Sequence, residues 1–174
     1  MSQWNRKKSV TFAAVLLLCG LVVTGCSQNT KPPGVDGSKY LLKSEPAGAQ
    51  DVIKARSEAK HEAEIVVVGR IGGGTNPWVD GRAAFTIVDP SLKACSDIPG
   101  DACETPWDYC CETDKLPAST AVIKVVDETG NIVKSDAREL LKVKELQTVV
   151  VRGKAQRDDA GNLTVIASGV YVRK

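Results

Sequence analysis

The chain has 174 residues, 23 of them basic and 21 acidic, and a formal net charge of +2 at pH 7. The first 25 residues hold three of the basic residues and none of the acidic ones, so the remaining 149 residues carry 20 basic and 21 acidic residues, a net charge of −1. This balance argues against nucleic acid as a partner, because domains that bind it usually carry a basic excess. Aromatic residues make up only 5% of the chain, so we expect one domain with an aliphatic core.

Residues 1–25 are predicted to be a signal peptide. Basic residues 6–8 precede an apolar run of about 14 residues, which is too short to span a bilayer and typical of a secretory signal. The next residues, Val23-Thr24-Gly25-Cys26, resemble the lipobox of bacterial lipoproteins, although that family usually has Leu where this chain has Val23. The resemblance implies acylation of Cys26 and an envelope protein anchored in the membrane, facing the periplasm or the exterior. The alternatives are an ordinary signal peptide with a chance cysteine, or an uncleaved anchor.

Two segments precede the predicted barrel. Residues 26–46 are rich in Pro, Gly, Ser and Lys and predict a flexible tether, apart from Tyr40-Leu41-Leu42, which we expect to dock onto the domain. Residues 47–62 contain good helix formers with a thin apolar stripe, which predicts a helix over about 48–60. This helix is expected to bury only a narrow face.

The rest of the chain predicts a small β-barrel. Runs rich in β-branched residues indicate strands at 64–71, 83–89, 121–126, 147–154 and 163–173, and a short helix at 135–141 with Ser135 as its N-cap. Five strands with one helix between the third and fourth follow the order of an OB-fold, so the prediction is mostly β, an OB-like barrel over 63–174. Gly69 and Gly153 lie inside strands, where a coiled barrel needs bulges or bends. We expect the core to include Val66, Val68, Phe85, Ile87, Ile123, Val125, Val149, Val151, Val165 and Val170.

A resemblance supports this fold. The segment VVVRGKAQRDDAGNLTVIASGVYVRK, residues 149–174, looks like the last hairpin of many bacterial OB domains. The chain as a whole is similar to uncharacterised bacterial lipoproteins that carry such a barrel and a cysteine-rich loop. The resemblance implies a fold and no particular ligand.

The long segment between the second and third strands, residues 90–117, contains four cysteines and several acidic residues. The cysteines are Cys95, Cys103, Cys110 and Cys111. An even number of cysteines in an oxidising compartment favours two disulfides, with Cys110 and Cys111 pairing separately to Cys95 and Cys103. No bound metal or other cofactor is expected under this interpretation. The alternative is a metal or redox site, since four thiolates are the right number for a tetrahedral ion, although the chain has no C-x-x-C pair and neighbouring cysteines chelate one ion awkwardly.

Two loops supply candidate contacts with a ligand. The residues are Asn76, Trp78 and Arg82 in the glycine-rich loop after the first strand, and Trp107 and Tyr109 in the cysteine-rich segment. Exposed tryptophans would suit stacking on a sugar or a base, whereas buried ones would cap the barrel. The partner that we expect is an envelope protein or a glycan. An OB-type oligonucleotide or oligosaccharide binder is a further alternative.

Catalysis is not expected. His61 is the only histidine, and no sequence pattern for a nucleophile, a catalytic zinc or a phosphate-binding loop is present. The sequence therefore predicts a non-enzymatic binding or structural module.

Overall fold

The computed structural model describes residues 35–174. The predicted signal peptide and Cys26 lie outside the described residues. Within the described part, none of the helices has the length and apolar character needed to cross a membrane.

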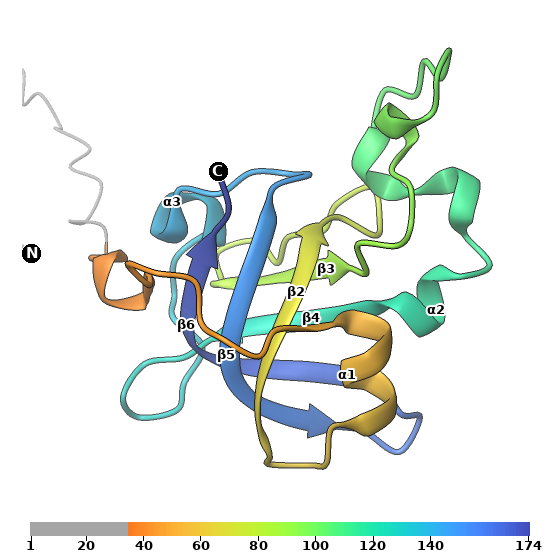
Figure 1. Ribbon diagram of the computed structural model, residues 1–174. Helices are drawn as coiled ribbons and strands as arrows, with labels where there is room; N and C mark the ends of the chain where they lie inside the picture. Colours follow the sequence, from red (N-terminus) through yellow and green to blue (C-terminus); the bar gives the residue numbers. More distant parts are fainter. Residues whose placement is uncertain (1–34) are drawn as a thin grey trace, which may run out of the picture. The chain divides into compact units, whose positions relative to one another are not determined.

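Five strands close into the predicted barrel (Figure 1). They are β2 Glu64–Ile71, β3 Ala84–Val88, β4 Thr120–Val125, β5 Thr148–Arg157 and β6 Leu163–Val172. The order β2-β3-β4-β6-β5 returns to β2 through a β2–β5 pairing; β4 and β6 run parallel, and the other barrel neighbours run antiparallel. The predicted OB-like barrel is confirmed. A two-residue strand that the sequence did not reveal, β1 Gln50–Asp51, pairs with β2 outside the barrel.

The helices are short. They are α1 Val52–Glu58, α2 Leu116–Ser119 and α3 Ala137–Leu141, with the 3-10 turns η1 Ser38–Tyr40, η2 Cys95–Asp97, η3 Pro106–Asp108 and η4 Cys110–Glu112. The N-terminal helix predicted over 47–62 is formed only as α1, which buries Val52 and Ala55. Helix α3 lies between β4 and β5 as predicted, but its N-cap is Asp136, whose side chain accepts from the Arg138 N–H, and not Ser135.

The barrel interior is aliphatic, as the composition predicts. Eight of the ten expected core residues belong to it: Phe85, Ile87, Ile123, Val125, Val149, Val151, Val165 and Val170. On β2 the expected face was wrong, because Val67 and not Val66 belongs to the interior cluster, opposite Val151. Val68 is buried as expected but lies outside this cluster. The predicted bulge at Gly153 is confirmed by a register shift in the β5–β6 pairing, where an added Cβ would lie 2.1 Å from the Ile166 carbonyl oxygen.

Part of the predicted tether lies against the barrel. Tyr40 is buried, Leu41 bridges to Val170, and the Leu42 N–H donates to the Val170 carbonyl at 2.9 Å. Farther along, Glu45 forms an ion pair with Arg173. The docking predicted for Tyr40-Leu41-Leu42 is confirmed, so this part of the predicted tether is ordered against the barrel.

The cysteine-rich segment leaves and re-enters the barrel at one point. The β3–β4 ladder runs to the Val88–Thr120 pair, and the Asp89 N–H then donates to the Ser119 carbonyl at 2.8 Å. Between these residues the chain projects beyond the end of β3, seen as the green segment in Figure 1. We call residues 90–118 the insertion. The buried Asp89 carboxylate also accepts from the Ile53 N–H at the start of α1.

Candidate metal centre in the insertion

An ion pair fixes the first turn of the insertion to the barrel. Arg70, at the end of β2, lies 2.5 Å from the Asp97 carboxylate. The same carboxylate oxygen accepts from the Ala94 N–H at 3.1 Å. The hydrogen bond from Arg70 lowers the pKa of Asp97, so this carboxyl is ionised in the folded protein above acidic pH. The Arg70 link holds η2, and with it Cys95, against the barrel.

The glycine-rich loop after β2 holds the second turn of the insertion. The Gly73 N–H donates to the Trp107 carbonyl at 2.8 Å, and the Trp107 indole N–H donates to the Thr75 carbonyl at 3.1 Å. At Gly72 a Cβ would lie 2.5 Å from the Trp107 carbonyl oxygen. A glycine is therefore required here for close approach of the two backbones.

Tyr109 joins η3 to η4 and orients the residues on both sides of it. Its backbone is left-handed, with φ 59° and ψ 37°, which is uncommon for a residue other than glycine. Its side chain is fully buried against Val88, Leu92 and Ala94, and this burial raises the pKa of its hydroxyl. The buried ring fixes this unusual turn, and the turn brings Asp108 and Cys110 together.

The four cysteine sulfurs converge without bonding. The Cys110 Sγ lies 3.3 Å from the Cys95 Sγ, 3.9 Å from the Cys103 Sγ and 4.0 Å from the Cys111 Sγ. A disulfide requires a sulfur–sulfur distance of about 2.05 Å. Among residues 35–174 all the cysteines are free thiols, so the predicted pair of disulfides is not formed. The Cys110 Sγ lies among the three other sulfurs at comparable distances, and none of them is within bonding distance.

Carboxylates complete two groups of ligand atoms. In the first group, Cys95, Cys103, Cys110 and Asp108 place one ligand atom each within 4.8 Å of one another. In the second, Cys95, Asp101 and Cys111 do the same. The insertion therefore brings together sulfur and oxygen atoms of the kinds that could hold a thiophilic ion.

Hydrogen bonds orient the carboxylate of the first group. The Asp108 Oδ1 accepts from the Cys110 N–H at 2.9 Å, and the Oδ2 accepts from the Thr105 hydroxyl at 2.8 Å. Burial acts to raise the pKa of Asp108, but these hydrogen bonds together lower it below its ordinary value. Bonds of this kind to the groups that surround a metal fix ligand orientation. The carboxylate is thus held in place by the protein.

The surroundings of Cys110 favour the protonated form of its thiol. The hydrogen bond to Cys95 raises the pKa of Cys110, and desolvation and the contacts with Cys103 and Cys111 raise it further. Because a metal ion binds the thiolate, binding at this cluster releases protons.

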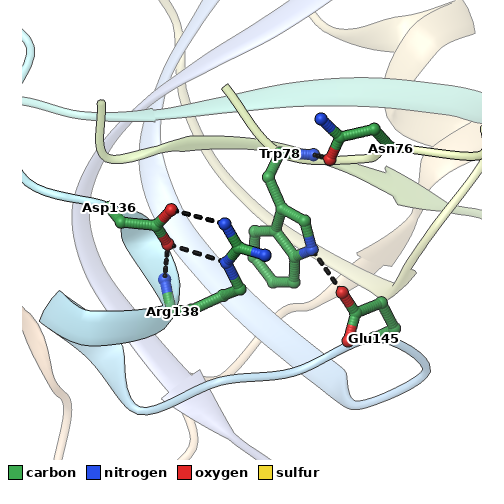
Figure 2. Close-up of polar contacts among 5 residues, drawn as sticks. All are labelled: Asn76, Trp78, Asp136, Arg138 and Glu145. Carbon is green, nitrogen blue, oxygen red and sulfur yellow. Dashed lines mark hydrogen bonds and ion pairs between the residues drawn. The ribbon is translucent and has the colours of Figure 1, made fainter. Parts of the chain in front are cut away.

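Of the five predicted ligand contacts, Trp78 belongs to the barrel core. Figure 2 shows its indole N–H donating to Glu145 at 2.6 Å, with the Arg138 guanidinium 5.4 Å above the ring. Asp136 in turn binds Arg138 through both carboxylate oxygens. Trp78 is 6% exposed, so it caps the barrel and offers no ring for stacking.

The other predicted contacts are scattered. Tyr109 is buried and Trp107 half-buried in the insertion, whereas Asn76 is exposed and its side chain accepts from the Trp78 N–H. Arg82 is exposed and lines an open pocket of about 770 Å³ with Lys39, Asp127 and Lys134 among others. Of the two alternatives for the tryptophans, the burial of Trp78 therefore agrees with capping of the barrel and not with an exposed pair for stacking.

Sequence reasoning identified the four cysteines and the acidic character of the insertion, but it did not combine thiols and carboxylates into one group of candidate ligands. The signal was present as a repeated Asp-x-Cys spacing, in Asp101-Ala102-Cys103 and Asp108-Tyr109-Cys110. In both repeats the carboxylate accepts from the N–H of the cysteine two residues later. The carboxylate of Asp108 lies in one ligand group with Cys110, whereas that of Asp101 lies beside the thiol of Cys111.

Comparisons with known proteins leave the chain without an assigned family. No protein-family profile matches the sequence, and no curated protein matches it. Among solved structures, one similar chain is described as OBody AM1L10 bound to hen egg-white lysozyme (TM-score 0.40, 13% identity, 76% of this chain and 98% of that chain covered). Another is a DUF3299 family protein from Pseudomonas aeruginosa PAO1 (TM-score 0.32, 16% identity, 83% and 97% covered). Similarity at this level carries no argument about function.

Proposed function

We propose that this protein is a lipid-anchored protein of the bacterial cell envelope that binds a thiophilic divalent metal ion, with zinc as the best fit. The ligands are Cys95, Cys103, Cys110 and Asp108. One observation carries the proposal: three sulfurs and a carboxylate oxygen, from the turns η2, η3 and η4 and the loop between η2 and η3, lie within 4.8 Å of one another. The role is binding, not catalysis.

The distances between the ligand atoms support tetrahedral coordination of one ion. With zinc–sulfur bonds of about 2.3 Å, two sulfurs of a tetrahedral site lie about 3.8 Å apart. The measured separations are 3.3 Å for Cys95–Cys110 and 3.9 Å for Cys103–Cys110, and the Cys95 Sγ lies 3.8 Å from the Asp108 Oδ1. The ligand atoms need only small movements to hold such an ion.

The types of ligand favour zinc over other metals. Three thiolates argue against calcium and magnesium, which take oxygen ligands. Copper(I) is a soft ion that prefers sulfur alone, and a carboxylate in the set favours a borderline ion such as zinc.

The envelope location rests on the sequence. The lipobox-like Val23-Thr24-Gly25-Cys26 supports acylation at Cys26, and two or three acyl chains anchor a protein stably. The acidic insertion would then be displayed outside the cytoplasm, with an envelope protein or a glycan as its partner and the half-buried Trp107 as one contact. The net charge of −1 after residue 25 disfavours nucleic acid.

Metal content tests the proposal. The full-length protein, extracted from membranes in detergent, should contain zinc by elemental analysis. Cys103→Ala and Asp108→Asn should each lower the zinc affinity by 10-fold or more, as expected for the loss of a ligand. The control is Asp114→Asn, the same chemical change at an exposed aspartate of the insertion that belongs to neither ligand group; it should leave the affinity unchanged. Native protein with two disulfides and no metal would overturn the proposal.

The anchor has a separate test. Mass spectrometry of the membrane fraction should show a chain that begins at an acylated Cys26, and Cys26→Ser should abolish this modification. Recovery of the unmodified wild-type chain from the soluble fraction would overturn the proposed lipid anchor and leave the metal site unaffected.

A further inference from the structure

The insertion contains a second group of ligands beside the proposed zinc site. The Cys111 Sγ lies 3.7 Å from the Asp101 Oδ2, and both atoms lie within 4.8 Å of the Cys95 Sγ. We propose that the insertion binds two thiophilic divalent ions, the second held by Cys95, Asp101 and Cys111, with the Cys95 thiolate bridging the two. This inference rests on the proposed function, because the bridge requires the first ion.

The neighbouring cysteines supply the first argument. Two consecutive cysteines chelate one ion awkwardly, because the single peptide link between them restricts how both sulfurs can face the same ion. In the structure they fall into different groups: Cys110 lies with the first ligand group, whereas Cys111 lies with the second. One ion would leave Cys111 without a ligand role, whereas two ions use all four cysteines.

The orientation of Asp101 supplies the second argument. Its Oδ1 accepts from the Cys103 N–H at 2.7 Å, which leaves the Oδ2 beside Cys111. The same geometry holds Asp108, whose Oδ1 accepts from the Cys110 N–H. Each carboxylate is therefore fixed by the backbone of a cysteine of the first group, so binding of the first ion would rigidify both carboxylates.

Cys95 is placed to serve both ions. It is the buried member of the cluster, held in η2 by the Arg70–Asp97 ion pair, while Asp101 and Cys111 are exposed on the solvent side. A thiolate sulfur has enough lone pairs to bind two ions. The buried Cys95 sulfur therefore connects a first group of four ligands with an exposed group of three.

The number of ligands distinguishes the two ions. Structural zinc sites have four protein ligands, whereas sites with three keep a position open for water or another molecule. The second ion, with three protein ligands on the exposed side, would keep such an open position. It should therefore exchange faster than the first ion and accept a small anionic or thiol ligand from solution.

Metal stoichiometry tests the inference on the full-length protein in detergent. Thiols are first reduced, the protein is loaded with zinc or cobalt(II), and bound metal is measured per chain. We expect two ions in the wild type and in Asp114→Asn, and one in both Cys111→Ser and Asp101→Asn. A chelator should remove one of the two wild-type ions at least 10-fold faster than the other. Circular dichroism of each variant checks that the barrel is folded.

The outcomes separate the inference from the proposed function. A wild type that binds no metal overturns both. A wild type that binds one ion overturns the inference and leaves the proposed function standing, provided that Cys103→Ala still lowers the affinity. If Cys111→Ser removes both ions, Cys111 is a ligand of the first ion and the division into two groups is wrong. If the two ions exchanged at equal rates, the claim that the second ion has an open coordination position would be wrong.

Discussion

Gly72→Ala should loosen the insertion and leave the barrel folded. A Cβ at this position would lie 2.5 Å from the Trp107 carbonyl oxygen and 2.9 Å from the Tyr109 Cε2, where ordinary contacts begin at 3.4 Å. One backbone must therefore move by about 0.9 Å to restore an ordinary contact. That movement weakens the adjacent hydrogen bond from the Gly73 N–H to the Trp107 carbonyl.

The free energy of unfolding should fall by about 1–3 kcal/mol. Overpacking at a tight contact costs about 1–3 kcal/mol, and a weakened hydrogen bond adds about 0.5–1.5 kcal/mol. Alanine in place of glycine offsets about 0.4–1 kcal/mol of this loss, because it restricts the unfolded chain. The matched control is Gly74→Ala, where an added Cβ would meet nothing within 4 Å. The effect of alanine on the unfolded chain is common to both variants. The difference between their free energies of unfolding therefore measures the effect of the close contact alone.

Two measurements check this prediction. Urea unfolding followed by circular dichroism should give Gly72→Ala a lower midpoint than Gly74→Ala, with similar slopes. Titration of the metal-free proteins with an aromatic disulfide reagent should show faster-reacting thiols in Gly72→Ala. Equal midpoints and equal thiol reactivity would refute the claim that this close approach positions the insertion.

Three further changes test the barrel. Val67→Ala should lower the free energy of unfolding by about 1–3 kcal/mol and Val66→Ala by less, because only Val67 faces the interior; urea unfolding that ranks them in reverse would contradict the assigned face. Asp136→Ala should cost about 0.5–2 kcal/mol near pH 7, through loss of the α3 cap. The hydrogen bond from Arg138 lowers the pKa of Asp136 in the folded state below its ordinary value of 3.8. The stabilisation by the ionised carboxylate is therefore complete well above pH 3.8 and is lost as the pH falls through the lowered pKa of the folded state. If Asp136→Ala were still less stable than the wild type in strong acid, the ionised carboxylate would not be the cause. Tyr40→Ala should detach the docked segment and raise protease cleavage near residue 40 while the barrel stays folded, as limited proteolysis with mass spectrometry would show.

The barrel could be predicted from the sequence because its signals are local. The run at 64–71 is β-branched and ends in three glycines, and the structure has a strand with the same bounds. The facing of that strand could not be predicted, because Val66, Val67 and Val68 are all apolar and show no alternation. It depends on the pairing of Val67 with Val151, far along the chain.

The helix boundaries show a similar limit. Residues 47–62 are good helix formers throughout, but α1 keeps only seven residues because few of them bury a side chain. At α3, Ser135 and Asp136 are both good N-caps by composition. The structure selects Asp136, whose carboxylate also binds the Arg138 guanidinium.

The candidate site was predictable in position but not in chemistry. The cysteines and the length of the insertion are evident from the sequence, whereas the distances among the sulfurs depend on contacts with distant residues. Arg70 reaches Asp97 from β2, and Gly73 binds the backbone of Trp107. The burial of Trp78 also depends on a distant partner, Glu145, so the sequence left open whether this tryptophan is exposed or caps the barrel.

The hydrogen bond between the Asp89 N–H and the Ser119 carbonyl makes the insertion a transferable unit. Its two ends lie as close together as the ends of a tight β-hairpin turn, so the barrel strands would meet equally well with a two-residue turn in its place. During evolution such a segment can be lengthened, shortened or replaced without disturbing the register of the strands. For protein engineering, the same geometry allows residues 90–118 to be grafted onto the hairpin of another barrel, provided that the host supplies a glycine and an arginine where this chain has Gly72 and Arg70.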